Sequence, residues 1–141
     1  MKIFLSIFLA FTCFVNNPSG VDELITLRVK VTNLEKHDSN VMIAVFSHYT
    51  TFLTEDMYRQ QIISVSNFNE TFAEFKVAKG EYAIAVFQDT NMNGDLDRNI
   101  FSYPIEPFGF SNNYRPLVKP PHWTDVAFRV EEESDIEVEL N

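Results

Sequence analysis

Oxygen-bearing side chains recur at alternate positions in one short stretch of this chain, with the spacing of a calcium-binding loop. The residues are Asp89, Asn91, Asn93, Asp95 and Asp97. In calcium loops, oxygens at positions 1, 3, 5, 7 and 9 converge on one ion, and a glycine at position 6 permits a sharp turn. Gly94 occupies that sixth position. Because the donors are hard oxygens without His or Cys, the predicted ion is Ca²⁺.

Position 12 of the loop departs from the calcium-hand pattern. Ile100 stands where a calcium hand has a bidentate glutamate. We predict that Glu106 supplies the missing carboxylate, because the proline-rich segment could fold back over the loop. Glu106 could instead accept hydrogen bonds from backbone N–H groups of residues 109–113. An ion-free polar turn is the alternative for the whole loop, since Asn, Asp and Gly also favour turns.

The segments that flank the loop place it in a β-domain. Residues 80–88 are β-branched, aromatic and small, which is typical of a buried strand. Pro104, Pro107 and Gly109 exclude a helix soon after the loop. A calcium sensor needs helices that move, so the predicted ion is structural.

The rest of the chain also shows strand periodicity. Apolar and polar residues alternate at 24–32, 126–130 and 136–140, and a deeply buried strand is predicted at 41–46. Residues 62–65 and 71–77 complete about seven strands, with 24–32 and 41–46 expected to form one hairpin and the last two strands another. The predicted fold is all-β, a single antiparallel Greek-key β-sandwich.

Two sequence motifs in close succession resemble a known bacterial family. They read Gly80-x-Tyr82-Ala83-(x)5-Asp89-x-Asn91-x-Asn93-Gly94-x-Leu96-Asp97 and Pro104-x-Glu106-x-x-Gly109-Phe110-Ser111-Asn112-Asn113. This combination resembles the exported family called domain of unknown function 2141. The resemblance covers essentially the whole mature chain and implies a small sandwich of the transthyretin-like or carboxypeptidase-regulatory-like type. It implies no activity.

Aromatic residues crowd the segment 101–123, which lacks strand alternation. The candidate ligand-binding residues are Tyr103, Phe108, Phe110 and Trp123. Their rings could form a platform for a carbohydrate or a peptide, because aromatic faces supply a large apolar contact area. They could equally seal the open end of the sandwich.

The first twenty residues have the pattern of a secretory signal peptide. A basic start and a short apolar run precede a polar stretch, so we expect residues 1–20 to be removed and 21–141 to form one domain. The protein is then exported, to the periplasm or the extracellular space. Lipid anchoring through Cys13 is a less favoured alternative, and a mature chain without cysteine needs no disulfide.

Charge and motif content restrict the function classes. The net charge of −9 argues against nucleic acids and anionic membrane surfaces as partners. No membrane span is expected after signal removal. No nucleophile motif, zinc-ligand pair or glycosidase signature is present, so we predict a binding or structural module without enzymatic activity, with a secreted hydrolase as the least favoured reading. The partner is an unknown protein or carbohydrate.

Overall fold

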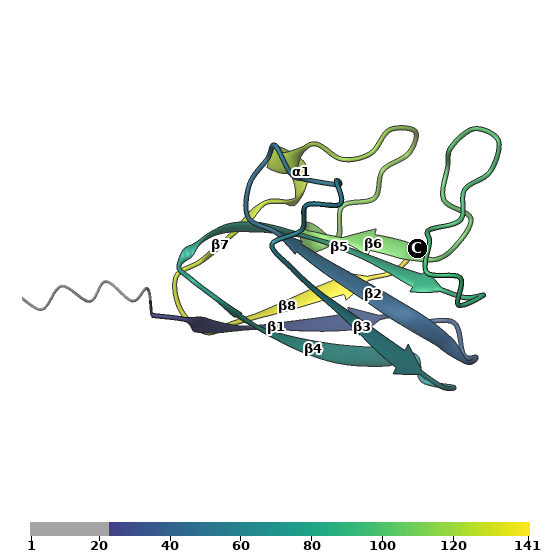
Figure 1. Ribbon diagram of the computed structural model, residues 1–141, viewed down its shortest axis with the longest axis horizontal. Helices are drawn as coiled ribbons and strands as arrows, with labels where there is room; N and C mark the ends of the chain where they lie inside the picture. The colour runs from purple at the N-terminus through teal and green to yellow at the C-terminus, as the bar shows by residue number, and fades with distance from the viewer. Residues whose placement is uncertain (1–22) are drawn as a thin grey trace, which may run out of the picture.

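Two β-sheets stack face to face in the computed structural model, which describes residues 23–141 (Figure 1). The predicted signal segment 1–20 and Cys13 lie outside these residues. No helix within 23–141 is long and apolar enough to cross a bilayer. The all-β prediction is confirmed. The elements are β1 (Ile25–Thr32), β2 (Ser39–Phe46), β3 (Arg59–Val65), β4 (Glu70–Val77), β5 (Gly80–Asp89), β6 (Phe108–Phe110), η1 (Ser111–Asn113), α1 (Trp123–Val126), β7 (Phe128–Val130) and β8 (Ser134–Glu139).

The smaller sheet has the strand order β4-β1-β8, and the larger sheet has the order β3-β2-β5-β6 with β7 also paired to β5. Most strand pairs are antiparallel, but β1 and β8 run parallel, with Val29 opposite Ile136. The prediction of a purely antiparallel sandwich is therefore wrong at this pair. β8 lies beside β1 and extends the same apolar inner face, because its inward-facing Val138 joins the core that contains Val29 and Val31.

Both predicted hairpins are wrong. β1 and β2 lie in different sheets, as do β7 and β8. The connection after β1 is held across the end of the sandwich, where Glu35 N donates to Gln88 Oε1 (2.8 Å) and Gln88 Nε2 donates to Glu35 O (3.0 Å). The predicted 126–130 strand also begins late, because Val126 ends α1, whose first turn is held by His122 N donating to Asp125 Oδ2 (2.8 Å).

The main core lies between the two sheets and follows the predicted alternation. Leu27, Val29 and Val31 of β1 point inward and are fully buried. They meet inward-facing residues of the opposite sheet, such as Ile43 and Ile84. Each fully buried aliphatic side chain of this kind contributes roughly 1.5–3 kcal/mol of stabilisation.

The outer face of the larger sheet is also apolar. Three connections rise above it on the same side, formed by residues 47–58, 90–107 and 114–122 (Figure 1). Beneath them a second apolar cluster is built from Ala83, Phe108, Phe110 and Val126, with Phe52, Ala85, Phe87 and Trp123 packed against it. The larger sheet is therefore covered on both faces, and its outer side is where a binding site can form.

Candidate cation-binding loop and adjoining groove

The oxygen-rich loop begins at the buried end of β5. The Asp89 side chain is almost fully buried, with 1% of the residue exposed. Its Oδ1 accepts a hydrogen bond from Asn93 N (3.1 Å), and its Oδ2 accepts one from Gly94 N (2.8 Å). Met92 and Gly94 have positive φ angles of 57° and 88°, so the chain turns sharply around this carboxylate. Asp89 thus organises the first half of the loop.

Four of the five predicted loop donors share one hydrogen-bond network. Asn91 Nδ2 and Asn93 Nδ2 donate to the two oxygens of Asp97, at 2.6 and 3.2 Å. Asn91 Oδ1 and Asn93 Oδ1 accept bonds from the backbone N–H groups two residues later, at 3.1 and 2.8 Å. The Asp95 carboxylate is exposed and makes no hydrogen bond or ion pair within residues 23–141.

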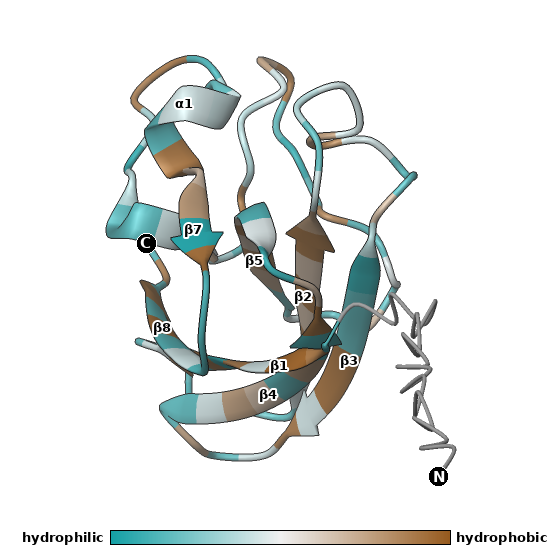
Figure 2. Ribbon diagram, turned by 90° about the vertical axis from the view of Figure 1, so that its left-hand side faces the viewer, coloured by the Kyte–Doolittle hydropathy of each residue, from teal (hydrophilic) through white to brown (hydrophobic). Residues whose placement is uncertain are grey.

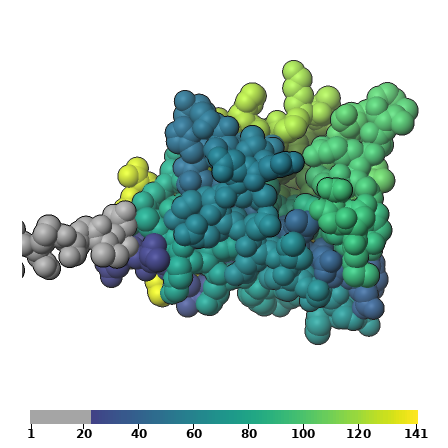
Figure 3. Space-filling model, viewed as in Figure 1, coloured from purple at the N-terminus to yellow at the C-terminus, as the bar shows by residue number. Residues whose placement is uncertain are grey.

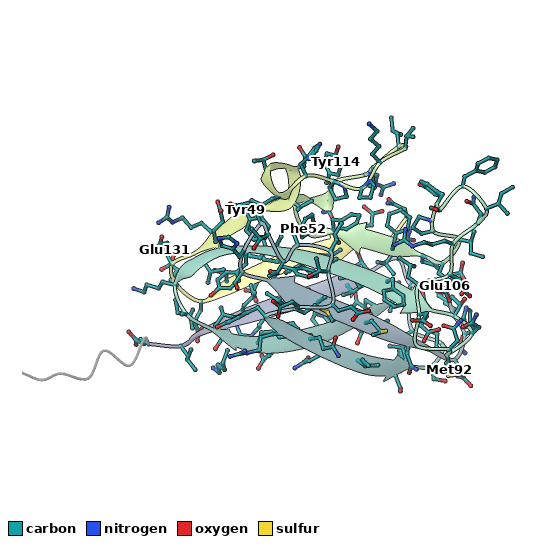
Figure 4. All side chains as sticks on the ribbon, turned by 45° about the horizontal axis from the view of Figure 1, so that its top comes forward. Tyr49, Phe52, Met92, Glu106, Tyr114 and Glu131 are labelled. Carbon is teal, nitrogen blue, oxygen red and sulfur yellow. The ribbon has the colours of Figure 1, made fainter. Side chains whose placement is uncertain are left out.

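Glu106 fastens the two ends of the loop to each other. It is 5% exposed and lies beside the loop that carries Met92 (Figure 4). Its Oε1 accepts bonds from Thr90 N (2.7 Å) and Thr90 Oγ1 (3.0 Å), and its Oε2 accepts one from Asp97 N (3.1 Å). The proline-rich segment therefore does fold back to the loop. The carboxylate bonds to Thr90 and Asp97, and not to the 109–113 turn.

Carboxylates gather at this loop without forming an ion pair within residues 23–141. In the described part of the chain, no Lys, Arg or His lies within ion-pair distance of Asp89, Asp97 or Glu106. Their hydrogen-bond donors are backbone and amide N–H groups and the Thr90 hydroxyl. Within the same residues, no group of three or more His, Cys, Asp or Glu side chains is arranged to hold a metal ion. A cation at this loop would therefore need amide and main-chain oxygens as well as carboxylates.

The second sequence motif has structural contacts along its length. Ser111 Oγ is fully buried, accepts a hydrogen bond from Ile84 N (3.0 Å) and donates to Val126 O (2.5 Å). Asn112 Nδ2 donates to Ala127 O (3.1 Å), and Asn113 Oδ1 accepts from Glu139 N (2.8 Å). These side chains join the end of β6 to β5, β8 and the α1 region.

Gly109 allows β6 to pass close to β8. Adding one methyl group at this position is therefore predicted to lower the stability of the domain strongly. A Cβ at Gly109 would lie 2.7 Å from Glu139 O and 2.9 Å from Val138 Cγ1. We expect Gly109→Ala to lower the free energy of unfolding by about 2 kcal/mol, measured by urea denaturation. Gly80→Ala is the matched control, because its Cβ would meet Tyr82 at an ordinary 3.5 Å. Equal losses for both variants would contradict the close approach.

A groove of about 580 Å³ lies on the outer face of the larger sheet. Met42, Ala44 and Phe87 contribute to its lining from the sheet. Its walls come from the three connections, and the space-filling view shows the surface hollowed between them (Figure 3). Gly94 and Asp95 line it too, so the oxygen-rich loop forms part of one wall.

The predicted aromatic residues divide between the groove and the packing around it. Tyr103, Phe108 and Phe110 line the groove. Phe108 and Phe110 are buried, whereas Tyr103 is 39% exposed. Trp123 does not line it; its ring packs edge-on against Phe52 at 5.8 Å, and its Nε1 donates to Glu81 Oε2 (3.0 Å). Three of the four rings therefore lie in the groove lining, and Trp123 packs outside it; their role in binding a ligand stays a prediction.

Sequence reasoning missed the groove itself. One signal was present, because residues 41–46 and 82–87 are continuously apolar, whereas a half-exposed strand alternates between apolar and polar residues. Such runs indicate a sheet buried on both faces. The groove nevertheless requires three connections from distant parts of the chain to rise on one side, and no local pattern encodes that.

The fold and the loop define a small two-sheet β-protein with an oxygen-rich turn beside an apolar groove. The chain belongs to the family described as uncharacterised protein conserved in bacteria (DUF2141), which it matches over residues 29–138. The predicted family is thus confirmed. No curated protein and no solved structure matches the chain.

Proposed function

We propose that this protein is an exported binding module without enzymatic activity, in which a calcium ion holds the 89–97 loop. The ion is structural: it fixes a loop that forms part of the wall of the groove. The groove lining is mostly apolar with a few polar groups, as in binding sites for small ligands, which supports a binding role. Export is supported by the signal-like pattern of the first twenty residues.

One observation carries the calcium proposal. The buried Asp89 carboxylate lies at the base of a loop whose donors are all hard oxygens, and no basic side chain of residues 23–141 pairs with it. Buried charges in proteins are normally paired with an opposite charge or coordinate a metal. A divalent cation would supply the positive charge that the described side chains do not.

The donor set suits calcium chemically. Asp89, Asn91, Asn93 and Asp97 would hold the ion with side-chain oxygens, and Asp95 with its main-chain carbonyl. Each amide oxygen has two lone pairs, so Asn91 and Asn93 can accept a backbone N–H and still ligate. Because the Glu106 oxygens already accept three bonds, its role in this proposal is to hold the two ends of the loop.

Calcium is expected to stabilise the domain measurably. Extracellular calcium modules bind with Kd of about 10⁻⁴ to 10⁻³ M. At about ten times Kd, the ion would add about 1.4 kcal/mol to the free energy of unfolding. That corresponds to a rise in Tm of about 5 °C for a domain of this size. Calorimetric titration and thermal melting of residues 21–141, in calcium or chelator, measure both quantities. Absence of heat and of any shift at millimolar calcium would contradict the proposal.

A second candidate function is supported by the groove. Its volume falls in the range of small-ligand sites, and its lining is mostly apolar with a few polar groups. Tyr103, Phe108 and Phe110 would contact a bound carbohydrate or peptide. Chemical-shift changes at groove residues on adding such a ligand in chelator would test this candidate separately from the calcium site.

The strand order supports a Greek-key assignment of the sandwich. In a Greek key the fourth strand returns to lie beside the first, in the order 4-1-2-3. Here β4 lies beside β1 in one sheet, and β2 lies beside β3 in the other. We infer a Greek key folded across two sheets, of the transthyretin-like type that the family resemblance implies.

A further inference from the structure

Two neighbouring connections expose apolar side chains at their tips. Ile100 is 92% exposed and Phe101 83%, and Leu117 and Val118 are 89% and 84% exposed. Both connections project to the same side of the molecule in two perpendicular views (Figures 1 and 2). Both also contribute lining residues to the groove, so they lie close together. Large apolar side chains this exposed mark an interaction site when they cluster.

The exposure of the first tip is built into its structure. Asn99 Oδ1 accepts hydrogen bonds from Phe101 N (2.9 Å) and Tyr103 N (3.1 Å). Asn99 N donates to Tyr103 O (2.9 Å), and Arg98 and Pro104 form an isolated antiparallel β-bridge. These bonds close a tight loop that turns Ile100 and Phe101 away from the domain.

The second tip is restrained by prolines and by an ion pair. Pro116, Pro120 and Pro121 flank it, and each fixes its own φ angle. Arg115 at its base is paired with Glu139 (3.1 Å). Leu117 and Val118 therefore project from an anchored segment.

The charged residues within the two tip segments, 98–104 and 115–121, are all basic, while Asp95 and Asp97 precede the first segment and Asp125 follows the second. Residues 98–124 contain Arg98, Arg115 and Lys119 and a single carboxylate, Glu106, which is buried. Arg98 and Lys119 have no ion-pair partner in the described part of the chain. The net charge of −9 suggested that anionic membranes are excluded as partners. Screening acts over about 10 Å, however, so carboxylates remote from the tips contribute little at a surface that meets them.

We propose that these two tips dock the protein on the surface of an anionic lipid bilayer. Ile100, Phe101, Leu117 and Val118 insert at the headgroup boundary, and Arg98 and Lys119 meet the anionic headgroups. Two separate projecting tips suit a deformable apolar medium better than a protein interface, which requires a continuous patch of about 800 Å² on each partner. The proposal does not depend on calcium.

Vesicle co-sedimentation tests the proposal. Residues 21–141 contain the whole sandwich and exclude the apolar signal segment, which could itself bind lipid. We expect binding to equimolar phosphatidylcholine–phosphatidylglycerol vesicles at low salt, and at least about tenfold weaker binding to phosphatidylcholine alone. The double variant Ile100→Ser/Phe101→Ser should weaken binding at least about tenfold. Arg98→Gln/Lys119→Gln should weaken it about 25-fold, since each cation contributes about a fivefold factor.

Matched controls identify the surface responsible. Ile62→Ser/Phe68→Ser removes two side chains that are 56% and 63% exposed elsewhere on the protein. Lys36→Gln/Lys79→Gln removes the same charge as the Arg98/Lys119 variant from other exposed positions. Both controls should bind as the parent does, and thermal melting checks that each variant folds. A parent protein that stays in the supernatant, or tip variants that bind as tightly as the parent, would overturn the proposal. Neither outcome would affect the calcium-induced shift in Tm.

Discussion

Replacing Glu106 by alanine is expected to lower the free energy of unfolding by about 3 kcal/mol. The carboxylate is buried and accepts three hydrogen bonds, two from Thr90 and one from Asp97 N. Its removal leaves these donors without partners and detaches the loop's two ends from each other. The loss should therefore be as large as that of a core truncation, although Glu106 lies in a connection. Urea denaturation monitored through Trp123 measures it.

One further variant separates the hydrogen bonds of Glu106 from its bulk, and a second is a control at an exposed carboxylate. Glu106→Gln keeps an acceptor for Thr90 but turns an amide donor toward Asp97 N, so we expect about half the loss. Glu55→Ala, an exposed carboxylate on the groove lining, should change stability by no more than about 0.5 kcal/mol. If Glu106→Ala behaved like Glu55→Ala, the loop would not depend on this residue.

The faces of the strands could be predicted from the sequence, but their partners could not. The period-two pattern of β1 correctly marks Leu27, Val29 and Val31 as inward-facing. Both predicted hairpins failed because alternation encodes which face is buried and carries no information about which strand lies alongside. The partners of β1 are β4 and β8, which are far away in sequence. β6 is only three residues long, too short for any periodic signal.

The loop was more predictable than the groove, because a sequence pattern encodes local structure and not contacts between distant segments. The loop donors all lie within nine consecutive residues, so their spacing alone indicates a turn that gathers oxygens. Glu106, predicted as a distant ligand of the loop, lies beside it and accepts hydrogen bonds from Thr90 N and Asp97 N; its role as a ligand stays a prediction. Its contacts to backbone N–H groups could not be predicted, since they depend on how the chain packs between β5 and β6. The groove is assembled from three connections and has no sequence signature.

The loop and the groove share residues, which gives the calcium proposal a functional consequence. Gly94, Asp95 and Leu96 line the groove and belong to the loop. An ion that orders the loop would also fix this part of the wall, so a ligand that needs the wall would bind more tightly in calcium. By linkage, that ligand would raise the affinity for calcium by the same factor.

Asp89→Asn is expected to abolish the rise in Tm that calcium produces. Asp89 is the buried carboxylate of the loop, and the substitution removes its charge while keeping its shape. Without calcium the variant should lose only about 1 kcal/mol, because its amide oxygen can still accept from Asn93 N while the bond to Gly94 N is lost. Thermal melting in calcium and in chelator gives both quantities from one sample.

Asp56→Asn is the matched control, since Asp56 is an exposed carboxylate outside the loop. This variant should keep the full calcium-induced rise of about 5 °C. A full rise in Asp89→Asn would mean that calcium binds elsewhere. If both variants lost the rise, calcium would act through the overall negative charge and not through a site. A rise lost in Asp89→Asn alone assigns the ion to the 89–97 loop, because the two substitutions change the net charge equally.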